Sequence, residues 1–323
     1  MRALLLTSHE SPPEITESDC PSPGRREIRV RIAACGLNFA DLLMQKGTYQ
    51  ETPALPFVMG MEVAGVVDAL GADVHGFAIG DRVAVFGGHG GLAELGCFAA
   101  DRAVHLPDSM SWEDAAAFQI AYGTSHLALY HRARLLPGET LLVLGAAGGV
   151  GLTAVQIGKL LGARVVACAR GADRLAIAQK AGADTLIDAE TGDIRAEMKA
   201  LGGADVVYDA VGGAQFEAAF RSCRPEGRIL TIGFASGEVP QIKANHLLVK
   251  NLSVLGLYWG GYLSFRPDIL TGSLAQLLRW YEAGQLKPHI SHVLCLEQAV
   301  EGLDLLRRRK STGKVVIRIA DPD

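Results

Sequence analysis

The feature that most constrains the fold is a glycine-rich loop set between an apolar run and a helical pattern. The apolar run Leu141–Leu144 is followed by Gly145-Ala146-Ala147-Gly148-Gly149-Val150-Gly151, and a helical pattern continues to Leu161. In a dinucleotide-binding fold such glycines allow a tight turn and bring the backbone close to a pyrophosphate at the helix N-terminus. Aligned to G-x-G-x-x-G, the first glycine is Ala146, which departs from the consensus. A tight turn that binds no ligand remains the alternative.

The residues after this loop alternate between strand and helix patterns. Strands that alternate with helices of this length predict a parallel sheet covered on both faces. We therefore expect an α/β fold in which residues 124–261 form a doubly wound Rossmann domain. After Leu141–Leu144, its strands are expected at Arg164–Ala169, Thr185–Ile187, Asp205–Val207, Arg228–Ile232 and Ser253–Leu257.

The first third of the chain has a β-rich pattern instead. Ile28–Ala33 alternates polar and apolar residues, and β-branched runs at Glu62–Val67 and Arg82–Phe86 end in glycines. Short strands with Gly/Pro turns predict a small barrel-like domain over residues 1–123. The tail, about 262–323, has two helical patterns and a closing strand, and we expect it to complete this domain. A helix should begin after Ser111, with Ser111 as N-cap.

The end of the second strand of the expected Rossmann domain indicates which nucleotide would bind. NAD-binding folds usually carry Asp or Glu there, about 20 residues after the loop, to hold the ribose 2′-hydroxyl. This chain has Arg170 at that place and Arg174 one helical turn later. Two guanidinium groups suit a 2′-phosphate, so NADP(H) is the expected cofactor. Asp173 is the nearest carboxylate, and we expect it to cap the following helix; surface arginines without a ligand are the alternative reading.

Composition excludes several classes of protein. The chain has 323 residues, 49% hydrophobic and 20% charged, as expected for a globular protein of two domains. A formal net charge of −4 disfavours a protein that binds nucleic acid or an anionic membrane. The six cysteines form no CxxC pair, so neither a zinc ribbon nor a redox dithiol is indicated. No signal peptide or transmembrane span is predicted, and we expect a cytoplasmic protein.

Motifs along nearly the whole chain resemble those of the medium-chain dehydrogenase/reductases, specifically the zeta-crystallin-like quinone oxidoreductase branch. The resemblance implies a GroES-like substrate domain, a Rossmann domain and usually a homodimer. It rests on the segments 35–41, 46–49, 55–65, 146–151, 205–213, 227–237, 248–251 and 256–260.

The resemblance raises the question of zinc, because the alcohol-dehydrogenase branch uses a catalytic zinc ion. In that branch the motifs G-x-C-x-x-D and G-H-E supply a thiolate and an imidazole. This chain has Asn38 and Met61 at those places, followed by Asp41 and Glu62. Neither an amide nor a thioether is a competent zinc ligand there, and Cys97 stands alone where a four-cysteine lobe would lie. We therefore expect no metal site.

The resemblance also implies roles for individual residues. Asn38, Asp41 and Tyr49 would face the nicotinamide and the acceptor, with Asn38 or Tyr49 as hydrogen-bond donor. Asp41 could equally be a structural carboxylate that holds its loop, and Tyr49 could be simple pocket packing. The family pattern places further residues against the cofactor, namely Thr124, Gly233, Phe234, Ala235, Ser236, Tyr258 and, more weakly, Lys314. Ala189 stands where some relatives have a tyrosine for the 2′-phosphate, so that phosphate would depend more on Arg170 and Arg174.

These features together predict a zinc-independent oxidoreductase that transfers hydride from NADPH to a quinone or a similar conjugated carbonyl compound. Such an acceptor takes hydride directly and its oxyanion can be protonated by water, so no obligatory acid–base residue is expected. The nearest alternative is an NADPH-dependent reductase of activated C=C bonds in enones or enoyl thioesters. A second alternative is an NADPH-binding protein without turnover, structural or RNA-binding as some crystallin relatives are. The acidic balance and the retained Asn38, Asp41 and Tyr49 disfavour the latter.

Overall fold

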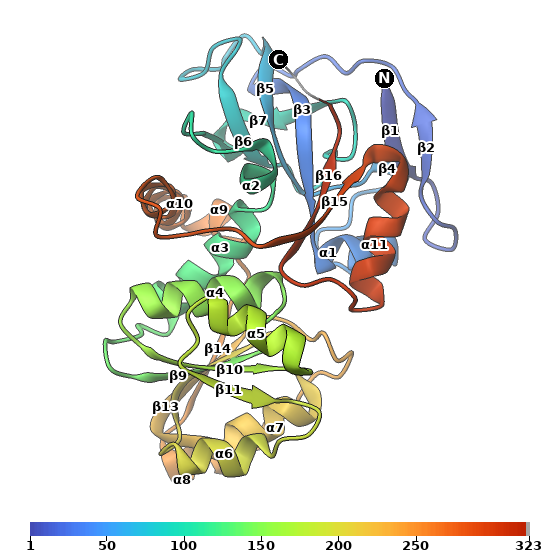
Figure 1. The fold of residues 1–323 in the computed structure, drawn as a ribbon. Helices are drawn as coiled ribbons and strands as arrows, with labels where there is room; N and C mark the ends of the chain where they lie inside the picture. Colours follow the sequence, from blue (N-terminus) through green and yellow to red (C-terminus); the bar gives the residue numbers. More distant parts are fainter. Residues whose placement is uncertain (321–323) are drawn as a thin grey trace. The chain divides into compact units, whose positions relative to one another are not determined.

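The structure is a computed structural model that describes residues 1–320. The chain divides into two compact units: Met1–Ile120 together with the chain from Pro288 onward, and Ala121–Lys287 (Figure 1). The boundary near residue 120 lies close to the one expected from the sequence. Residues 262–287, however, belong to the second unit, so the tail completes the first unit only from Pro288 and not from about 262.

The second unit is built on a six-stranded parallel sheet whose order is β11-β10-β9-β12-β13-β14. Counted from β9, this is the strand order 3-2-1-4-5-6 of a doubly wound dinucleotide-binding fold, as the sequence predicted. The strands span β9 Thr140–Leu144, β10 Arg164–Ala169, β11 Thr185–Asp188, β12 Ala204–Asp209, β13 Cys223–Thr231 and β14 Ser253–Gly256.

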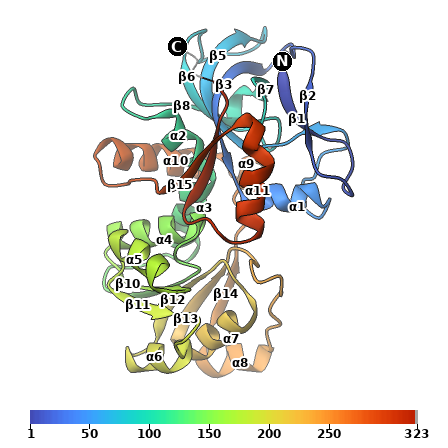
Figure 2. The same cartoon turned by 45° about the vertical axis from the view of Figure 1, so that its right-hand side comes forward.

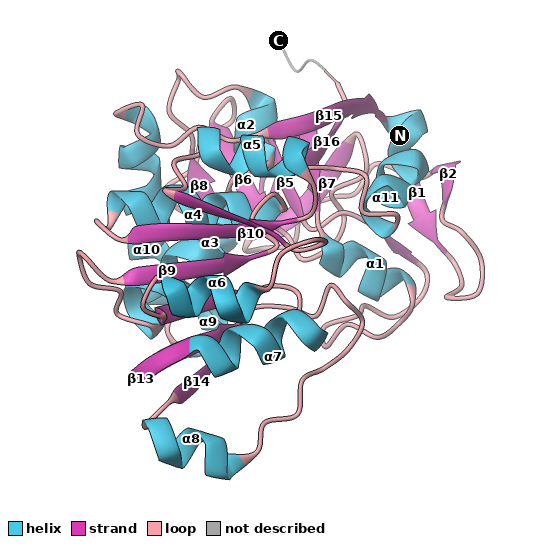
Figure 3. Ribbon diagram, turned by 60° about the horizontal axis from the view of Figure 1, so that its bottom comes forward, coloured by secondary structure: helices cyan, strands magenta, loops and turns pink. Residues whose placement is uncertain are grey.

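Helices cover both faces of this sheet (Figures 1 and 3), which explains why its central strands have no polar face. Helices α4 and α5 lie on one face, and α6 and α7 pack against each other on the other face. Apolar residues of β9, β10 and β12 form one core with Met198 of α6 and with Phe216 and Phe220 of α7. The bounds are α4 Gly149–Leu160, α5 Ala172–Lys180, α6 Ile194–Ala200, α7 Gly213–Ser222 and α8 Ala244–Lys250.

The remaining helices of this unit explain why residues 262–287 belong to it. Helix α10, Pro267–Glu282, buries Leu270, Leu274 and Leu277. Its Ser273 Oγ lies 2.7 Å from Nδ1 of His126, and Trp280 contacts the same imidazole edge-on. Periodicity alone could not show which unit this amphipathic helix covers. The other elements here are α3 Gln119–His126, the π-helical turn η2 Leu127–Arg132 and α9 Tyr262–Phe265.

The first unit contains a seven-stranded sheet in which β3 occupies a central place. The sheet order is β15-β16-β3-β5-β6-β8, and β7 also pairs with β3. Only the β15–β16 pair is parallel. The strands span β3 Glu27–Leu37, β5 Glu62–Leu70, β6 Arg82–Phe86, β7 Leu95–Ala99, β8 Ala103–His105, β15 Ile290–Cys295 and β16 Lys314–Arg318. Strand β15 was not expected from the sequence.

A small three-stranded sheet and short helices complete this unit. Its strands are β1 Arg2–Leu6, β2 Glu14–Glu17 and β4 Phe57–Val58. Helix α11 packs against α1 and covers β15 and β16 (Figure 2). The helical elements are α1 Phe39–Gln45, α2 Trp112–Ala116, α11 Ala299–Arg307 and the 3-10 turns η1 Ala100–Arg102 and η3 Leu296–Gln298. Ser111 caps α2 through the Asp114 amide, which confirms the predicted helix start.

Among residues 1–320, no helix has the length and apolar character needed to cross a bilayer.

Candidate functional site

In the second unit, the residues predicted to bind the cofactor follow the carboxyl ends of neighbouring parallel strands. The register pairs Leu144 with Cys168 and with Asp209, and Thr231 pairs with both Asp209 and Gly256, so these strands end at one edge of the sheet. The strand order changes direction between the parallel neighbours β9 and β12. This edge is therefore the switch point at which such folds bind ligands. The structure therefore brings the glycine loop, Arg170, the segment 233–236 and Tyr258 to the same edge of one sheet.

The glycine loop fits a dinucleotide because its close contacts leave no room for side chains. Gly145 has φ of 68°, a conformation that favours glycine, and it directly precedes Ala146. A Cβ on Gly151 would lie 2.2 Å from the Gly145 carbonyl oxygen. The Ala146 amide donates to the Cys168 carbonyl at 3.0 Å, which continues the sheet ladder. Because the left-handed residue is Gly145, an alanine at the next position costs the turn nothing.

Helix α4 begins directly at this loop, with Gly148 as N-cap and no acidic residue in its first turn. The amides of a first helical turn lack intrahelical acceptors and attract anions. Buried hydroxyl groups hold this end of the helix in place. Ser125 Oγ lies 2.9 Å from the Val150 carbonyl, 2.8 Å from Thr153 Oγ1 and 2.9 Å from the Tyr208 hydroxyl. The loop and helix therefore fit the pyrophosphate of a dinucleotide.

The two arginines predicted to meet a 2′-phosphate follow β10. Arg170 comes directly after that strand, and Arg174 lies in the first turns of α5. The sequence prediction that Asp173 caps α5 is wrong: the N-cap is Gly171, with φ of 75°, and Asp173 lies inside the first turn. The Gly171 amide donates instead to Asp188 Oδ1 at 3.1 Å. The backbone amides that bind Asp188 hold the pKa of its carboxyl below the ordinary value.

The segment Gly233–Ser236 is anchored by a carboxylate that the sequence analysis did not single out. Asp209, at the end of β12, is buried and accepts the amides of Val211 and Gly212 at 2.8 and 2.9 Å. The residues that Asp209 fixes in turn hold the segment. The Ala210 carbonyl accepts the Ala235 amide at 3.1 Å, and the Val211 carbonyl accepts the Ser236 amide at 2.8 Å. Burial raises the pKa of Asp209, and the two amides oppose that shift. An aspartate at the end of a buried strand, directly before Ala-Val-Gly-Gly, was the available signal.

Two further cofactor candidates lie on this unit with different exposure. Thr124 is buried on α3, whereas the Phe234 side chain is 36% exposed. An aromatic ring left this exposed at a strand end is not packed in the core. Thr124, Phe234 and Tyr258 remain predicted cofactor contacts.

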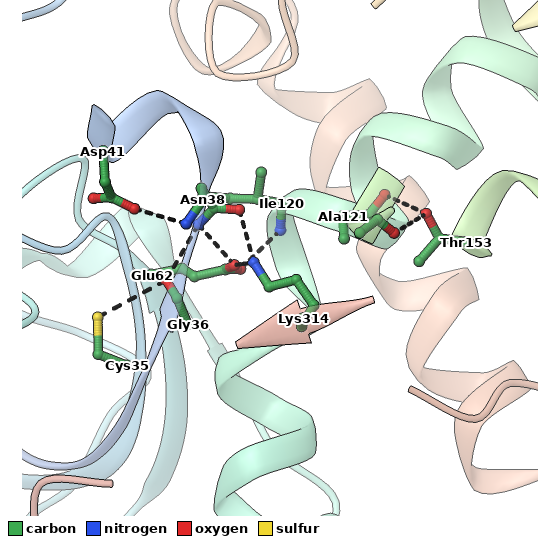
Figure 4. Close-up of polar contacts among 10 residues, drawn as sticks. Cys35, Gly36, Asn38, Asp41, Glu62, Ile120, Ala121, Thr153 and Lys314 are labelled. Carbon is green, nitrogen blue, oxygen red and sulfur yellow. Dashed lines mark hydrogen bonds and ion pairs between the residues drawn. The ribbon is translucent and has the colours of Figure 1, made fainter. Parts of the chain in front are cut away.

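In the first unit, three strand ends bring together a buried polar cluster (Figure 4). Asn38 directly follows β3, Glu62 begins β5 and Lys314 begins β16. Because β3 is antiparallel to both neighbours, its end lies beside their beginnings. Lys314 Nζ lies 2.5 Å from Glu62 Oε1 and 2.7 Å from Asn38 Oδ1. The side chains of Lys314 and Glu62 are only 6% and 1% exposed.

The Asn38 amide is fully used inside this cluster. Its Nδ2 group donates to Glu62 Oε1 at 3.0 Å and to the Gly36 carbonyl at 3.2 Å, while Oδ1 accepts from Lys314. The neighbours define the amide orientation, since Lys314 can only donate and the other two groups can only accept. Asn38 therefore has no remaining amide hydrogen for an acceptor molecule. Tyr49, the other predicted donor, remains a prediction.

Asp41 holds the loop at Asn38, which was one of the two roles that the sequence left open for it. Its side chain is 0% exposed, and Oδ2 accepts the Asn38 backbone amide at 2.7 Å. The other oxygen, Oδ1, is buried without a hydrogen bond in the described part of the chain. Burial raises the pKa of Asp41 to about 7; Glu62 adds to the shift, whereas the Asn38 and Gly60 amides and the Lys314 ammonium oppose it. A carboxyl group without exposed surface does not contact an acceptor in this conformation.

Replacing Asp41 by asparagine should change how stability depends on pH. Asp41 has a folded-state pKa of about 7 against an ordinary value of 3.8, so folding takes up a proton between these values. The contribution of Asp41 to the unfolding free energy should therefore fall as pH rises through this window, by up to about 1.4 kcal/mol per unit, and then level off above pH 7. Urea unfolding at pH 5 and pH 8 measures this difference. From pH 5 to pH 8, the unfolding free energy of Asp41→Asn should rise by about 2–3 kcal/mol relative to that of wild type. The control Asp19→Asn, at an exposed position, should show no such rise. If the unfolding free energies of Asp41→Asn and wild type differ by the same amount at both pH values, the raised pKa of Asp41 is refuted.

Comparison with known proteins places both units in one family. Residues 24–108 match the model of the alcohol dehydrogenase GroES-like domain, and residues 149–278 match that of the zinc-binding dehydrogenases. The quinone oxidoreductase-like protein 2 homolog of Nematostella vectensis is 42% identical over 300 residues, covering 91% of this chain and 82% of that protein. The chain belongs to the medium-chain dehydrogenase/reductase superfamily, in its quinone oxidoreductase branch. It is accordingly an oxidoreductase, as the sequence predicted.

Solved structures of this superfamily agree with the fold over 98% of the chain. The quinone oxidoreductase of Escherichia coli, solved as a complex with NADPH, has a TM-score of 0.91 and 28% identity, covering 98% of this chain and 100% of that one. The Thermus thermophilus quinone oxidoreductase, also solved with NADPH, has a TM-score of 0.86 and 33% identity over 98% of this chain and 100% of that one. These matches confirm the Rossmann and GroES-like architecture.

The zinc implied by one family description does not fit the residues of this oxidoreductase. Asn38 and Met61 stand where zinc-dependent relatives supply a thiolate and an imidazole. Asn38 Oδ1 already accepts from the Lys314 ammonium at 2.7 Å, and Met61 is buried. Among residues 1–320, no group of three or more His, Cys, Asp or Glu side chains could hold a metal ion. The sequence analysis gave no role at the acceptor site to the charged pair of this cluster, Glu62 and Lys314. It placed Lys314 with the cofactor instead.

Proposed function

We propose that this oxidoreductase transfers hydride from NADPH to a quinone or a similar conjugated carbonyl compound without a metal ion. The observation that carries the proposal lies at the edge of the parallel sheet where the strands end. A glycine loop and a helix N-terminus follow β9, and two arginines follow the neighbouring strand β10. Relatives described as quinone oxidoreductases in complex with NADPH support both the cofactor and the acceptor.

Each part of the sheet edge would hold one part of the cofactor. The backbone of Gly145–Gly151 and the first turn of α4 would bind the pyrophosphate. Arg170 and Arg174 would bind the 2′-phosphate, because guanidinium groups form charge-assisted hydrogen bonds to phosphate oxygens. The segment Gly233–Ser236, held by Asp209 through Ala210 and Val211, would fix the nicotinamide amide with its backbone groups.

The chemistry that NADPH supplies when bound is hydride donation from its reduced nicotinamide ring. The protein then has to orient the acceptor and stabilise the negative charge that develops on the acceptor oxygen. Asn38 cannot donate to that oxygen while its amide is bound to Glu62 and Gly36. The family resemblance gives Tyr49 as the other candidate donor, and on that basis we propose it for this role. The Tyr49 carbonyl accepts the hydroxyl of Thr52 at 2.7 Å, which fixes the backbone from which the ring projects. Water supplies the final proton.

Loss of the two arginines should discriminate between the two nicotinamide cofactors. Arg170→Ala with Arg174→Ala should weaken NADPH binding by about 2–5 kcal/mol, since each charge-assisted hydrogen bond contributes about 1.5–3 kcal/mol. NADH binding should change little because NADH has no 2′-phosphate. Titration of nucleotide fluorescence measures both affinities, and equal losses for the two nucleotides would remove these arginines from the site.

Steady-state oxidation of NADPH with quinones, enones and an enoyl thioester tests the acceptor. Turnover of quinones supports the proposal. Turnover of enones or the thioester alone would move the reaction to double-bond reduction, and tight NADPH binding without any turnover would make the protein a non-enzymatic binder. The homodimer and the cytoplasmic location expected from the sequence remain predictions.

A further inference from the structure

The Lys314 ammonium is a cation whose position is defined by three strand ends. It is bound to Glu62 Oε1 at 2.5 Å and to Asn38 Oδ1 at 2.7 Å, and only 6% of its side chain is exposed. Glu62 is fixed in turn, because its second oxygen accepts the Ile120 amide at 3.0 Å. A buried charge with this many fixed partners cannot swing out to solvent without leaving Glu62 unpaired.

This cation lies where a metal ion would need space and negative ligands. Asn38 stands where zinc-dependent relatives have a thiolate. Its side-chain oxygen accepts from Lys314, and its two amide hydrogens are donated to Glu62 and Gly36. The Glu62 carboxylate, the nearest anionic ligand, is bound to the same ammonium. A divalent ion entering this cluster would face a positive charge, and both oxygens of Glu62 would already be bound. Replacing the two lost ligands would therefore not be enough to restore a metal site.

We propose that Lys314 is the resident cation of this site: held by Glu62 and Asn38, its ammonium excludes a metal ion and supplies a fixed positive charge at the acceptor site. This gives Lys314 a positioning and electrostatic role in the first unit, while the cofactor contact that the sequence suggested stays a prediction. The metal exclusion stands on the geometry alone, whereas the electrostatic role rests on the proposed function. A preorganised charge is effective in catalysis because it need not reorient when the oxyanion forms.

Metal binding tests the first part without any activity measurement. Asn38→Cys with Met61→His restores the thiolate and the imidazole while Lys314 stays in place. A second variant adds Lys314→Met, which frees the Glu62 carboxylate, and a control adds Lys310→Met at an exposed position instead. The probe is Co²⁺, read by thiolate-to-cobalt charge-transfer absorption, with Zn²⁺ stoichiometry from equilibrium dialysis.

Only the variant that lacks Lys314 should bind one equivalent of Co²⁺, at least about 100-fold more tightly than the other two. Equal affinity in all three variants, or no binding in any of them, would overturn the proposal, because the ammonium would then not decide whether metal enters. Thermal unfolding of each variant confirms that it is folded before the titration.

Kinetics test the second part with a neutral replacement of the pair. Glu62→Gln with Lys314→Met removes both charges and leaves neither group unpaired. Its kcat for quinone reduction should fall by about 10- to 100-fold, with KM for NADPH within about 2-fold of wild type. The matched control is Arg29→Met with Asp68→Asn, which removes another partly buried ion pair between β3 and β5, joined at 2.8 Å; its kcat should not change.

An unchanged kcat in the Glu62→Gln, Lys314→Met variant, or an equal loss in the control pair, would overturn the electrostatic role. If wild type itself reduces no quinone, the proposed function has failed, and the cobalt titration alone decides whether Lys314 excludes metal.

Discussion

Gly151→Ala is expected to abolish high-affinity NADPH binding while the protein still folds. The new Cβ would lie 2.2 Å from the Gly145 carbonyl oxygen and 2.8 Å from Ala146 Cα, and both are backbone atoms. The loop must therefore move, and its amides lose their alignment with the pyrophosphate. Loss of two charge-assisted hydrogen bonds weakens binding by about 3 kcal/mol or more, a factor above 100. Overpacking should lower the unfolding free energy by about 1–3 kcal/mol.

The matched control for this substitution is Gly272→Ala. Gly272 lies inside helix α10, and a Cβ there meets no atom within 4 Å. Alanine should stabilise that helix by about 0.5–1 kcal/mol and leave nucleotide binding unchanged. Isothermal titration with NADPH compares both variants with wild type. If Gly151→Ala kept wild-type affinity, the glycine loop would not be the pyrophosphate site.

The second large effect concerns stability and the buried ion pair. Lys314→Met alone leaves the Glu62 carboxylate, which is 1% exposed, without its cation. Removing one partner of a buried pair typically costs about 3–5 kcal/mol, whereas removing both often costs little. We therefore expect Lys314→Met to lose about 3–5 kcal/mol of unfolding free energy at pH 7, and Glu62→Gln with Lys314→Met to recover most of it.

Urea unfolding at pH 7 measures these differences. Equal stability of the single and double variants would mean that the two groups do not depend on each other in the fold.

Much of the second unit could be predicted from sequence because its signals are local. Each strand of the sheet is a short apolar run followed by a turn, and the glycine loop lies between β9 and α4 as expected. The right-handed crossover of successive βα units then restricts the possible strand orders. The structure also explains the alanine that departs from the consensus, since the left-handed residue is Gly145 and not Ala146.

The rest could not be predicted because it depends on contacts between distant segments. Lys314 and Glu62 are 252 residues apart, and no periodicity links one residue to the other. Their pairing follows only from the sheet order, in which β16 and β5 lie on either side of β3. The same limit applies to the complete burial of Asp41, which shares its cluster with both groups. A motif can identify a residue type at a position, but burial decides whether that residue contacts a ligand.

The measurement that tests the central claim most directly is quinone-dependent NADPH oxidation by protein whose metal content has been removed and checked. The enzyme is treated with a chelator, dialysed and assayed with NADPH or NADH at one quinone, before and after addition of Zn²⁺. The account predicts the same rate before and after chelation, no gain from Zn²⁺ and a clear preference for NADPH. A rate that is lost on chelation and restored by Zn²⁺ would contradict it.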